Sequence, residues 1–148
     1  MKKFIITALI AVAIGTSAFA DPSTINRKVL NHFATEFSDA ENVNWKVTNQ
    51  FAEATFMLDG KKMQAFYNPE GEMIGTSETF ALNKLPKQAL KTIAKKYPFP
   101  PYQLGECILF TNGDGESKYF VSFQTTKEKL IVEVSALGSV SEFKKTAL

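Results

Sequence analysis

The sequence predicts an α+β fold, in which one helix plus four antiparallel strands occur as a tandem repeat. The two copies are expected to join into one antiparallel sheet of about eight strands, with both helices packed on one face. The main observation is that residues 52–74 align without a gap to residues 119–141, at an offset of 67. Both segments alternate apolar and other residues in the same phase, which is typical of half-buried strands. An amphipathic helical pattern precedes each segment and can cover its strands.

The alignment keeps identical residues as well as apolar positions. The identical pairs are Phe56 with Phe123, Lys62 with Lys129, and Gly71 with Gly138. At the apolar positions, Ala52, Ala54, Met63, Ala65, Tyr67 and Met73 fall on Tyr119, Val121, Leu130, Val132, Val134 and Val140. A one-residue shift would turn every side chain to the other face, so the shared phase assigns the same face to the core in both copies. The departures from this symmetry that matter for function lie on the opposite face, where Glu53 is aligned to Phe120, Gln64 to Ile131 and Phe66 to Glu133.

One helix is expected in each copy. Residues 24–37 carry an apolar stripe of Ile25, Val29, Leu30, Phe33 and Phe37. Residues 85–97 carry a second stripe of Leu85, Ala89, Leu90, Ile93 and Tyr97, which ends before Pro98. Steps of three and four residues place each stripe on one helix face. The stripes correspond at an offset of 60, so seven residues are inserted in the second copy, for which the 98–101 linker and the 112–117 turn have room.

The clearest hairpin is centred on Asp59-Gly60, a dipeptide that favours a two-residue type I′ turn. This turn pairs Phe56 with Met63, so turn chemistry and apolar pattern select the same register. The next turn, at 68–71, pairs Tyr67 with Met73 and Phe66 with Ile74. The expected strands lie around 43–47 (with Val43, Trp45 and Val47 as its apolar set) and at 51–58, 61–68, 72–80, 102–111, 118–125, 129–135 and 139–144.

The first twenty residues are expected to be a signal peptide, which makes the protein periplasmic or secreted. Lys2 and Lys3 form a basic region, residues 4–14 an apolar region, and Ala18-Phe19-Ala20 a cleavage site. The domain would then be residues 21–148, with copy one at about 22–81 and copy two at about 82–148. Without Lys2 and Lys3 the 17 basic residues become 15, which equals the 15 acidic residues. This balanced charge gives no reason to expect a nucleic-acid partner. No transmembrane segment follows the signal peptide, so we also expect no membrane span after its removal.

The sequence contains no recognisable catalytic, metal or cofactor motif, so we do not expect an enzyme. Cys107 is the only cysteine, which excludes an internal disulfide and favours a structural thiol. His32 is the only histidine and has no partner that would make a zinc site. The stretch 112–116, Asn-Gly-Asp-Gly-Glu, contains oxygen ligands but lacks the frame of an EF-hand. A hairpin turn explains it fully.

Several short motifs resemble one family of exported proteins. They are Asn-Val-Asn-Trp at 42–45, Phe56…Asp59-Gly60…Phe66-Tyr67…Gly71, Leu85-Pro86, and Tyr97-Pro98. Together with the signal peptide, this pattern resembles the PepSY-like proteins with a β-lactamase-inhibitor-protein-like (BLIP-like) fold, which are common in Bacteroidota. The resemblance implies the fold over the whole mature chain and a role in binding proteins or restraining peptidases. No inhibitory loop of the true β-lactamase inhibitors can be matched to residues here, so we do not expect inhibition of a β-lactamase.

The candidate binding residues lie on the sheet face that the helices are expected to leave open. They are Met57, Phe66, Ile74, Phe120, Ile131 and Phe143, interleaved with polar residues. Such a mixed face favours a protein or peptide partner in the cell envelope or outside the cell. Two alternatives are equally open at this point. These residues could be isolated on the surface of a monomer, or the face that they form could be covered in a homodimer. A second hypothesis is an inhibitor or regulator of an exported peptidase, acting through residues 97–102 or 112–117.

Overall fold

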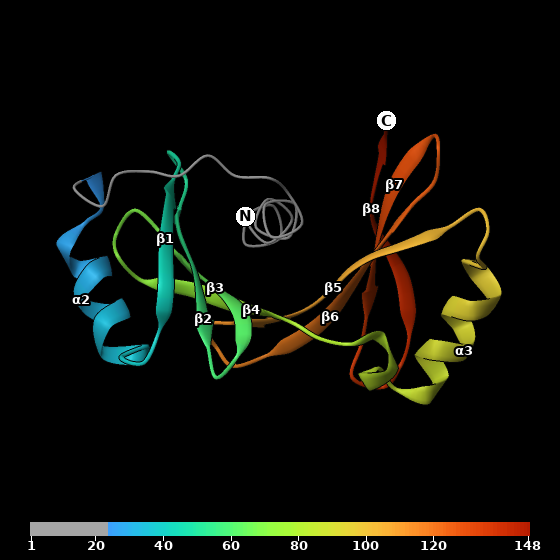
Figure 1. Ribbon diagram of the computed structural model, residues 1–148, viewed down its shortest axis with the longest axis horizontal. Helices are drawn as coiled ribbons and strands as arrows, with labels where there is room; N and C mark the ends of the chain where they lie inside the picture. The colour runs from blue at the N-terminus through green and yellow to red at the C-terminus, as the bar shows by residue number, and fades with distance from the viewer. Residues whose placement is uncertain (1–23) are drawn as a thin grey trace. The chain divides into compact units, whose positions relative to one another are not determined.

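The computed structural model describes residues 24–148, and the expected signal peptide at 1–20 lies outside them. Within residues 24–148, two α-helices and eight strands follow the order expected for two copies, and the strands form one antiparallel sheet in chain order (Figure 1). In the first copy the elements are α2 (Arg27–Glu36), β1 (Glu41–Val47), β2 (Ala52–Leu58), β3 (Lys61–Tyr67) and β4 (Met73–Thr79). In the second they are α3 (Lys87–Lys96), β5 (Gln103–Asn112), β6 (Ser117–Gln124), β7 (Glu128–Val134) and β8 (Val140–Ala147), after a short 3₁₀-helix at Leu82–Lys84. The fold predicted from the repeat is confirmed.

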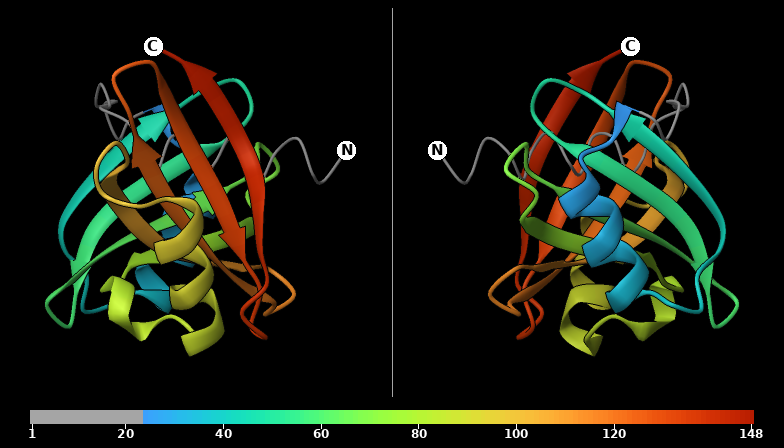
Figure 2. Two further views of the ribbon diagram at one scale, coloured as in Figure 1. Left: turned by 90° about the vertical axis from the view of Figure 1, so that its right-hand side faces the viewer. Right: turned by 90° about the vertical axis from the view of Figure 1, so that its left-hand side faces the viewer.

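The chain divides into two compact units, each with its own helix. The described part of one unit is residues 24–78 with 111–116, and the other is 79–110 with 117–148. Figure 2 shows α2 in front of the strands of its own unit in the right view, and α3 in front of its strands in the left view. Each unit therefore has a core between one helix and one part of the sheet.

The two helices correspond at the offset of 60 found in the sequence. Each is ten residues long, and each ends in the same way: the N–H groups of Phe37 and Tyr97 donate to the carbonyl oxygens of Phe33 and Ile93, at 2.8 Å in both cases. Helix α2 begins later than predicted because the Asn26 side chain caps it, accepting from the N–H of Lys28 at 2.9 Å.

Aromatic side chains make most of the core between α2 and its strands. Phe33 on α2 contacts Trp45 on β1 and Phe56 on β2, with ring centroids 5.1 and 5.0 Å apart and edge-on geometry. In the other unit Tyr97 stacks on Phe123 at 5.0 Å. Phe56 and Phe123 are the identical pair of the sequence alignment, and each packs against the helix of its own copy.

The hairpin registers follow the sequence prediction. Asp59 and Gly60 both have positive φ, +50° and +75°, as a type I′ turn requires. Ala52 pairs with Tyr67 in the first copy, and Tyr119 pairs with Val134 at the corresponding place in the second. The strand pairing therefore keeps the offset of 67. Part of the seven-residue insertion lies in β5, which has ten residues where β1 has seven.

Two details differ from the prediction. Phe66 pairs with Gly75 and not with Ile74, because the register shifts between Phe66 and Tyr67 and leaves Ile74 in a β-bulge. Val43 and Val47 are 36 and 39% exposed, although both were expected to join Trp45 in the core. The pairing of β1 with β2 shifts between Glu41 and Asn44, so the alternation is interrupted at Val43, while Val47 is the last residue of the strand.

Candidate functional site

The six predicted binding residues are divided between the two units and differ in exposure. Phe66 and Phe120 are fully buried and Ile131 is 4% exposed, whereas Met57, Ile74 and Phe143 are half-buried. The expectation that this face is open is therefore not met at Phe66, Phe120 and Ile131. The binding role predicted for these six residues stays a prediction, because burial alone does not test it.

Neighbouring aromatic rings explain part of this burial. Phe51, just before β2, lies edge-on to Phe66 with centroids 6.1 Å apart. In the other unit Phe143 lies on Phe120 at 4.9 Å. Phe143 occupies a bulge in β8, because Ile131 pairs with Lys144 and Val132 with Glu142. The non-helix face is thus packed at these positions.

The same face of the first copy contains a buried polar network, whose members Glu53 and Gln64 are aligned to apolar residues in the second copy. Glu53 is 1% exposed, Ser77 2% and Gln64 7%. The Gln64 amide donates to Glu53 Oε1 at 2.6 Å, and the Ser77 hydroxyl donates to the Gln64 carbonyl oxygen at 2.8 Å. Thr55 Oγ1 also donates to Glu53 Oε1, at 3.2 Å. Strands β2, β3 and β4 each supply one buried member.

The network ends on an unpaired atom. Glu53 Oε2 is buried and receives no hydrogen bond from any residue in 24–148. Burial raises the pKa of the Glu53 carboxyl, while the hydrogen bonds from Gln64 and Thr55 and the charges of Lys46 and Lys62 lower it in part. A buried carboxylate oxygen without a donor is unfavourable for folding, so this arrangement stands out from the rest of the core.

The second copy places apolar residues at the corresponding positions. Phe120 and Ile131 replace Glu53 and Gln64, and both are buried. The acidic residue is instead Glu133, which pairs across the strands with Phe120 and forms an ion pair with Lys118 at 2.8 Å. The signal for the network was present in the sequence as the disagreement between copies, but alternation alone does not show that Glu53 is buried.

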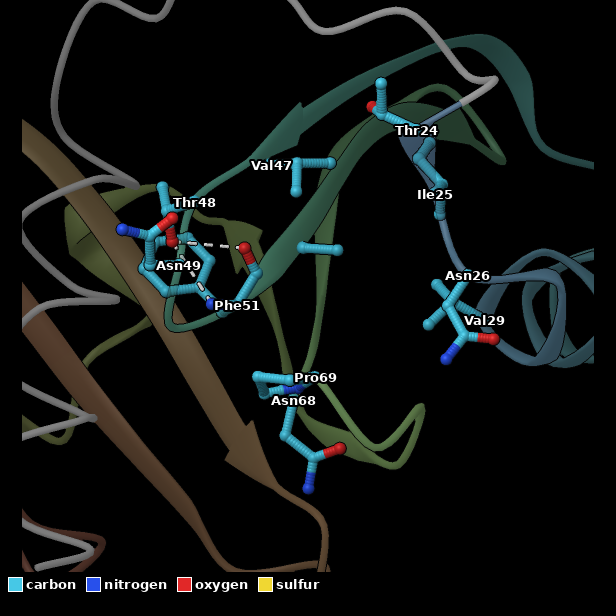
Figure 3. A pocket seen from close by; sticks show the side chains of 11 residues that line it. Thr24, Ile25, Asn26, Val29, Val47, Thr48, Asn49, Phe51, Asn68 and Pro69 are labelled. Atoms are coloured by element: carbon cyan, nitrogen blue, oxygen red, sulfur yellow. Dashed lines mark hydrogen bonds between the residues drawn. The ribbon is translucent and has the colours of Figure 1, made fainter.

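A pocket of about 160 Å³ lies at the start of α2 (Figure 3). Its walls come from residues 24–26, Val29, residues 47–49, Phe51, Ala52, Asn68 and Pro69. The side chain of Asn68 is already used, because its Oδ1 accepts from the N–H of Glu72 at 2.8 Å. The pocket contains no titratable side chain and is smaller than most ligand sites, which measure about 300–1,000 Å³.

The two loops considered for an inhibitor differ in how firmly they are held. In the 112–117 turn, Asn112 Oδ1 accepts from the N–H groups of Asp114 and Glu116, and the Gly113 N–H donates to the Ile74 carbonyl at 2.9 Å. In the 97–102 loop, Phe99 is 78% exposed. That loop closes through a hydrogen bond from the Tyr102 N–H to the Pro98 carbonyl at 3.2 Å. The 97–102 loop therefore exposes an aromatic side chain, whereas the 112–117 loop is a turn held by its own hydrogen bonds.

The side chains weighed for chemistry have ordinary structural surroundings. Burial and the neighbouring Glu106 raise the pKa of the Cys107 thiol to about 11, which keeps it unreactive. His32 is exposed on α2, with Nδ1 3.3 Å from the hydroxyl of Tyr67. Within residues 24–148, no group of three or more histidine, cysteine or acidic side chains is placed to hold a metal ion. No helix in this range is long and apolar enough to cross a membrane.

Solved structures with the same fold are known, although sequence comparisons find nothing. No protein-family model matches the chain. No curated protein sequence matches it. A DUF2874 family protein of Bacteroides ovatus superposes with a TM-score of 0.70 and 14% identity, covering 86% of this chain and 89% of its own. A BLIP-like protein of Bacteroides fragilis gives a TM-score of 0.66 and 12% identity, covering 88 and 89%.

A third structure, from Bacteroides eggerthii, is provisionally described as periplasmic. Its TM-score is 0.70 at 12% identity, over 82% of this chain and 88% of its own. The chain has the fold of these proteins. Identities this low establish the fold alone, so the fold expected from the resemblance is confirmed.

Proposed function

We propose that this chain is an exported, non-enzymatic protein that binds a protein or peptide through the non-helix face of its sheet. The similarity in fold to a BLIP-like protein and to a protein described as periplasmic supports this proposal. The unremarkable surroundings of Cys107 and His32 support a role without catalysis. The predicted signal peptide supports export, and a mature N-terminus at Asp21 would be its direct demonstration.

The observation that carries the proposal is the unpaired Glu53 Oε2 at the base of this face. A donor from a partner would satisfy an atom that folding leaves without one. Toward the Asp59-Gly60 turn this part of the sheet is less buried, since Thr55 and Met57 are half-buried and Lys62 is exposed. The proposed binding surface is therefore this side of strands β2, β3 and β4, with Met57 on β2 and Ile74 on β4 as its half-buried apolar residues.

The test is capture of a partner from the cell-envelope fraction of the source organism. Wild type is compared with Met57→Ser, and with Leu137→Ser as the matched control, because Leu137 is 90% exposed in the β7–β8 turn. Wild type and L137S should retain the same protein by mass spectrometry, and M57S should lose most of it. Equal retention by M57S, or no retained protein with any of the three, would contradict the proposal.

A peptidase inhibitor is the second candidate, and the exposed Phe99 in the 97–102 loop favours it. An inhibitory loop must present a side chain to a cleft, which this loop does and the hydrogen-bonded 112–117 turn does not. Purified protein should then slow an exported peptidase of the same organism, and Phe99→Ser should abolish the effect. Inhibition unchanged in F99S would exclude this loop.

A further inference from the structure

We propose that the outer face of α3, together with the 97–102 loop, binds an extended acidic segment of a partner protein. This surface, here called the lysine stripe and the Phe99 loop, belongs to the second unit. It goes beyond the proposed binding surface, because it shares no residue with strands β2, β3 and β4. The stripe is Lys87, Lys91 and Lys95.

The lysine stripe carries charge that the chain does not neutralise. The three lysines follow one another at intervals of four residues, so they lie on one face of the helix, and all are exposed. None of the three takes part in the ion pairs described within residues 24–148, among which are Lys61 with Glu78, Lys118 with Glu133 and Lys145 with Glu128. Helix α3 itself contains no acidic residue.

The first copy shows that the stripe is not required by the fold. At the offset of 60, Lys87, Lys91 and Lys95 correspond to Arg27, Asn31 and Thr35 of α2. Only one of the three is basic in α2, although the two helices have equal length and bury corresponding apolar residues. The connection after the helix differs too, since Ser38-Asp39 follows α2 where Pro98-Phe99-Pro100-Pro101 follows α3.

The spacing of the stripe matches an extended chain. Four residues of an α-helix rise by about 6 Å. Alternate residues of a strand are about 6.6 Å apart and point to the same side. A segment with carboxylates at alternate positions can therefore place one carboxylate near each lysine, and the opposite sign of charge selects it.

The Phe99 loop supplies an apolar contact at the end of the stripe. It continues directly from the C-terminal end of α3. Phe99 is 78% exposed, whereas the rings of Tyr97 and Tyr102 are half-buried and contact each other with centroids 5.4 Å apart. We therefore assign the partner's carboxylates to the lysine stripe and an apolar side chain to the Phe99 loop.

An anionic membrane would also attract three lysines, but the structure favours the peptide. A helix that lies in a membrane inserts an apolar face, and α3 has already buried Ala89 and Ile93, with Leu85 just before it, in its own core. Within residues 87–102, Phe99 is the one exposed large apolar side chain. A single aromatic side chain is better suited to a contact on a protein surface, where aromatic residues are common anchors.

The test uses synthetic peptides and the purified mature protein. One fluorescent peptide carries glutamate at alternate positions, leucine between them and phenylalanine at one end, and a second has the same composition with its glutamates in one block. In fluorescence anisotropy the alternating peptide should bind more tightly, and salt should weaken its binding. Lys91→Gln/Lys95→Gln should reduce its affinity about fivefold, and Phe99→Ser about tenfold.

The matched control removes the same charge elsewhere. Arg27→Gln/Lys127→Gln changes two exposed basic residues outside the stripe and should leave the affinity unchanged. If this control lost as much affinity for the alternating peptide as K91Q/K95Q does, net charge alone would explain the binding and the proposal would be overturned. No preference between the peptides would overturn it as well. So would binding only to vesicles that contain phosphatidylglycerol, which would assign the surface to a membrane.

Discussion

The two copies have the same backbone plan and the same core face, but they differ on the opposite face. In the first copy this face holds Glu53 in a buried hydrogen-bond network, with Oε2 unpaired among the described residues. In the second, Phe120 occupies that place and packs on Phe143. The acidic residue of the cross-strand pair has changed strands, from Glu53 opposite Phe66 to Glu133 opposite Phe120.

This difference separates what the repeat requires from what it leaves free. The helix-facing positions must fill one core in each unit, so Phe56 and Phe123 remain identical and their neighbours remain apolar. The other face has no such shared constraint. The first copy places a polar network there, and the second copy places packed aromatic side chains. Function is therefore best sought where the copies disagree, in the Glu53 network and in the lysine stripe.

The largest effect is expected from removing a ring on the non-helix face of the second copy. Phe120 is fully buried, so Phe120→Ala should lower the free energy of unfolding by about 3–5 kcal/mol. Urea denaturation measures this change, with Leu137→Ala as the exposed control. If F120A unfolded at the urea concentration of wild type, the face would be open in solution after all, as the sequence analysis expected.

The burial of this face could have been predicted from the strands themselves. Ala65-Phe66-Tyr67, Tyr119-Phe120-Val121 and Leu130-Ile131-Val132 are continuous apolar runs, which are typical of strands covered on both faces. The alternation identified the helix-facing positions correctly, but the second face was expected to be open and is buried at Phe66, Phe120 and Ile131. The bulges at Ile74 and Phe143 have no comparable signal, because alternation sets the face of a residue and not the point at which a strand gains one.

Local turn chemistry was the most reliable guide to the fold. Asp59-Gly60 fixed one register, and the turns at 68–72, 112–116 and 135–139 share a glycine with φ of +87°, +85° and +90° at the fourth position. The burial of Glu53 could not be predicted, since it depends on how the chain covers β2 and not on the residues beside it. The exposure of Phe99 could not be predicted either, because an apolar side chain is ordinarily expected in the core.

The second effect concerns the first copy and depends on pH. Because burial raises the pKa of Glu53, the folded chain keeps the carboxyl proton to a higher pH than the unfolded chain, whose value is near 4.5. Stability contributed by this group is therefore lost as pH rises above 4.5. Glu53→Gln imitates the protonated form, so we expect it to raise stability at pH 7 by about 1–2 kcal/mol.

Thermal unfolding of wild type and E53Q between pH 4 and pH 8 checks this expectation. The two should unfold together at pH 4 and separate as pH rises. Glu133→Gln is the control from the other copy, since Glu133 lies near the surface beside Lys118. A lower melting temperature for E53Q at pH 7 would show that the charged carboxylate is favourable in the native fold.

A smaller effect should distinguish the two hairpin turns. Gly60 has φ of +75° and open space around its α-carbon, so Gly60→Ala should be unfavourable only through its backbone, by about 1 kcal/mol. Lys127 in the β6–β7 turn has no positive φ, and Lys127→Ala should be close to neutral. Chemical denaturation of both variants measures the contrast. Equal stability of G60A and K127A would mean that the type I′ turn is not needed for the first register.

The smallest effect is expected for the ion pair that replaces the buried network in the second copy. Lys118 and Glu133 lie 2.8 Å apart, with side chains 55 and 24% exposed. Pairs of this kind are screened by water and salt, so Lys118→Ala should lower stability by no more than about 1 kcal/mol, and less at high salt. Urea unfolding at low and high ionic strength measures this. A loss as large as that of F120A would mean that Glu133 needs its cation as a buried acid does, and the two copies would then differ less than their burial indicates.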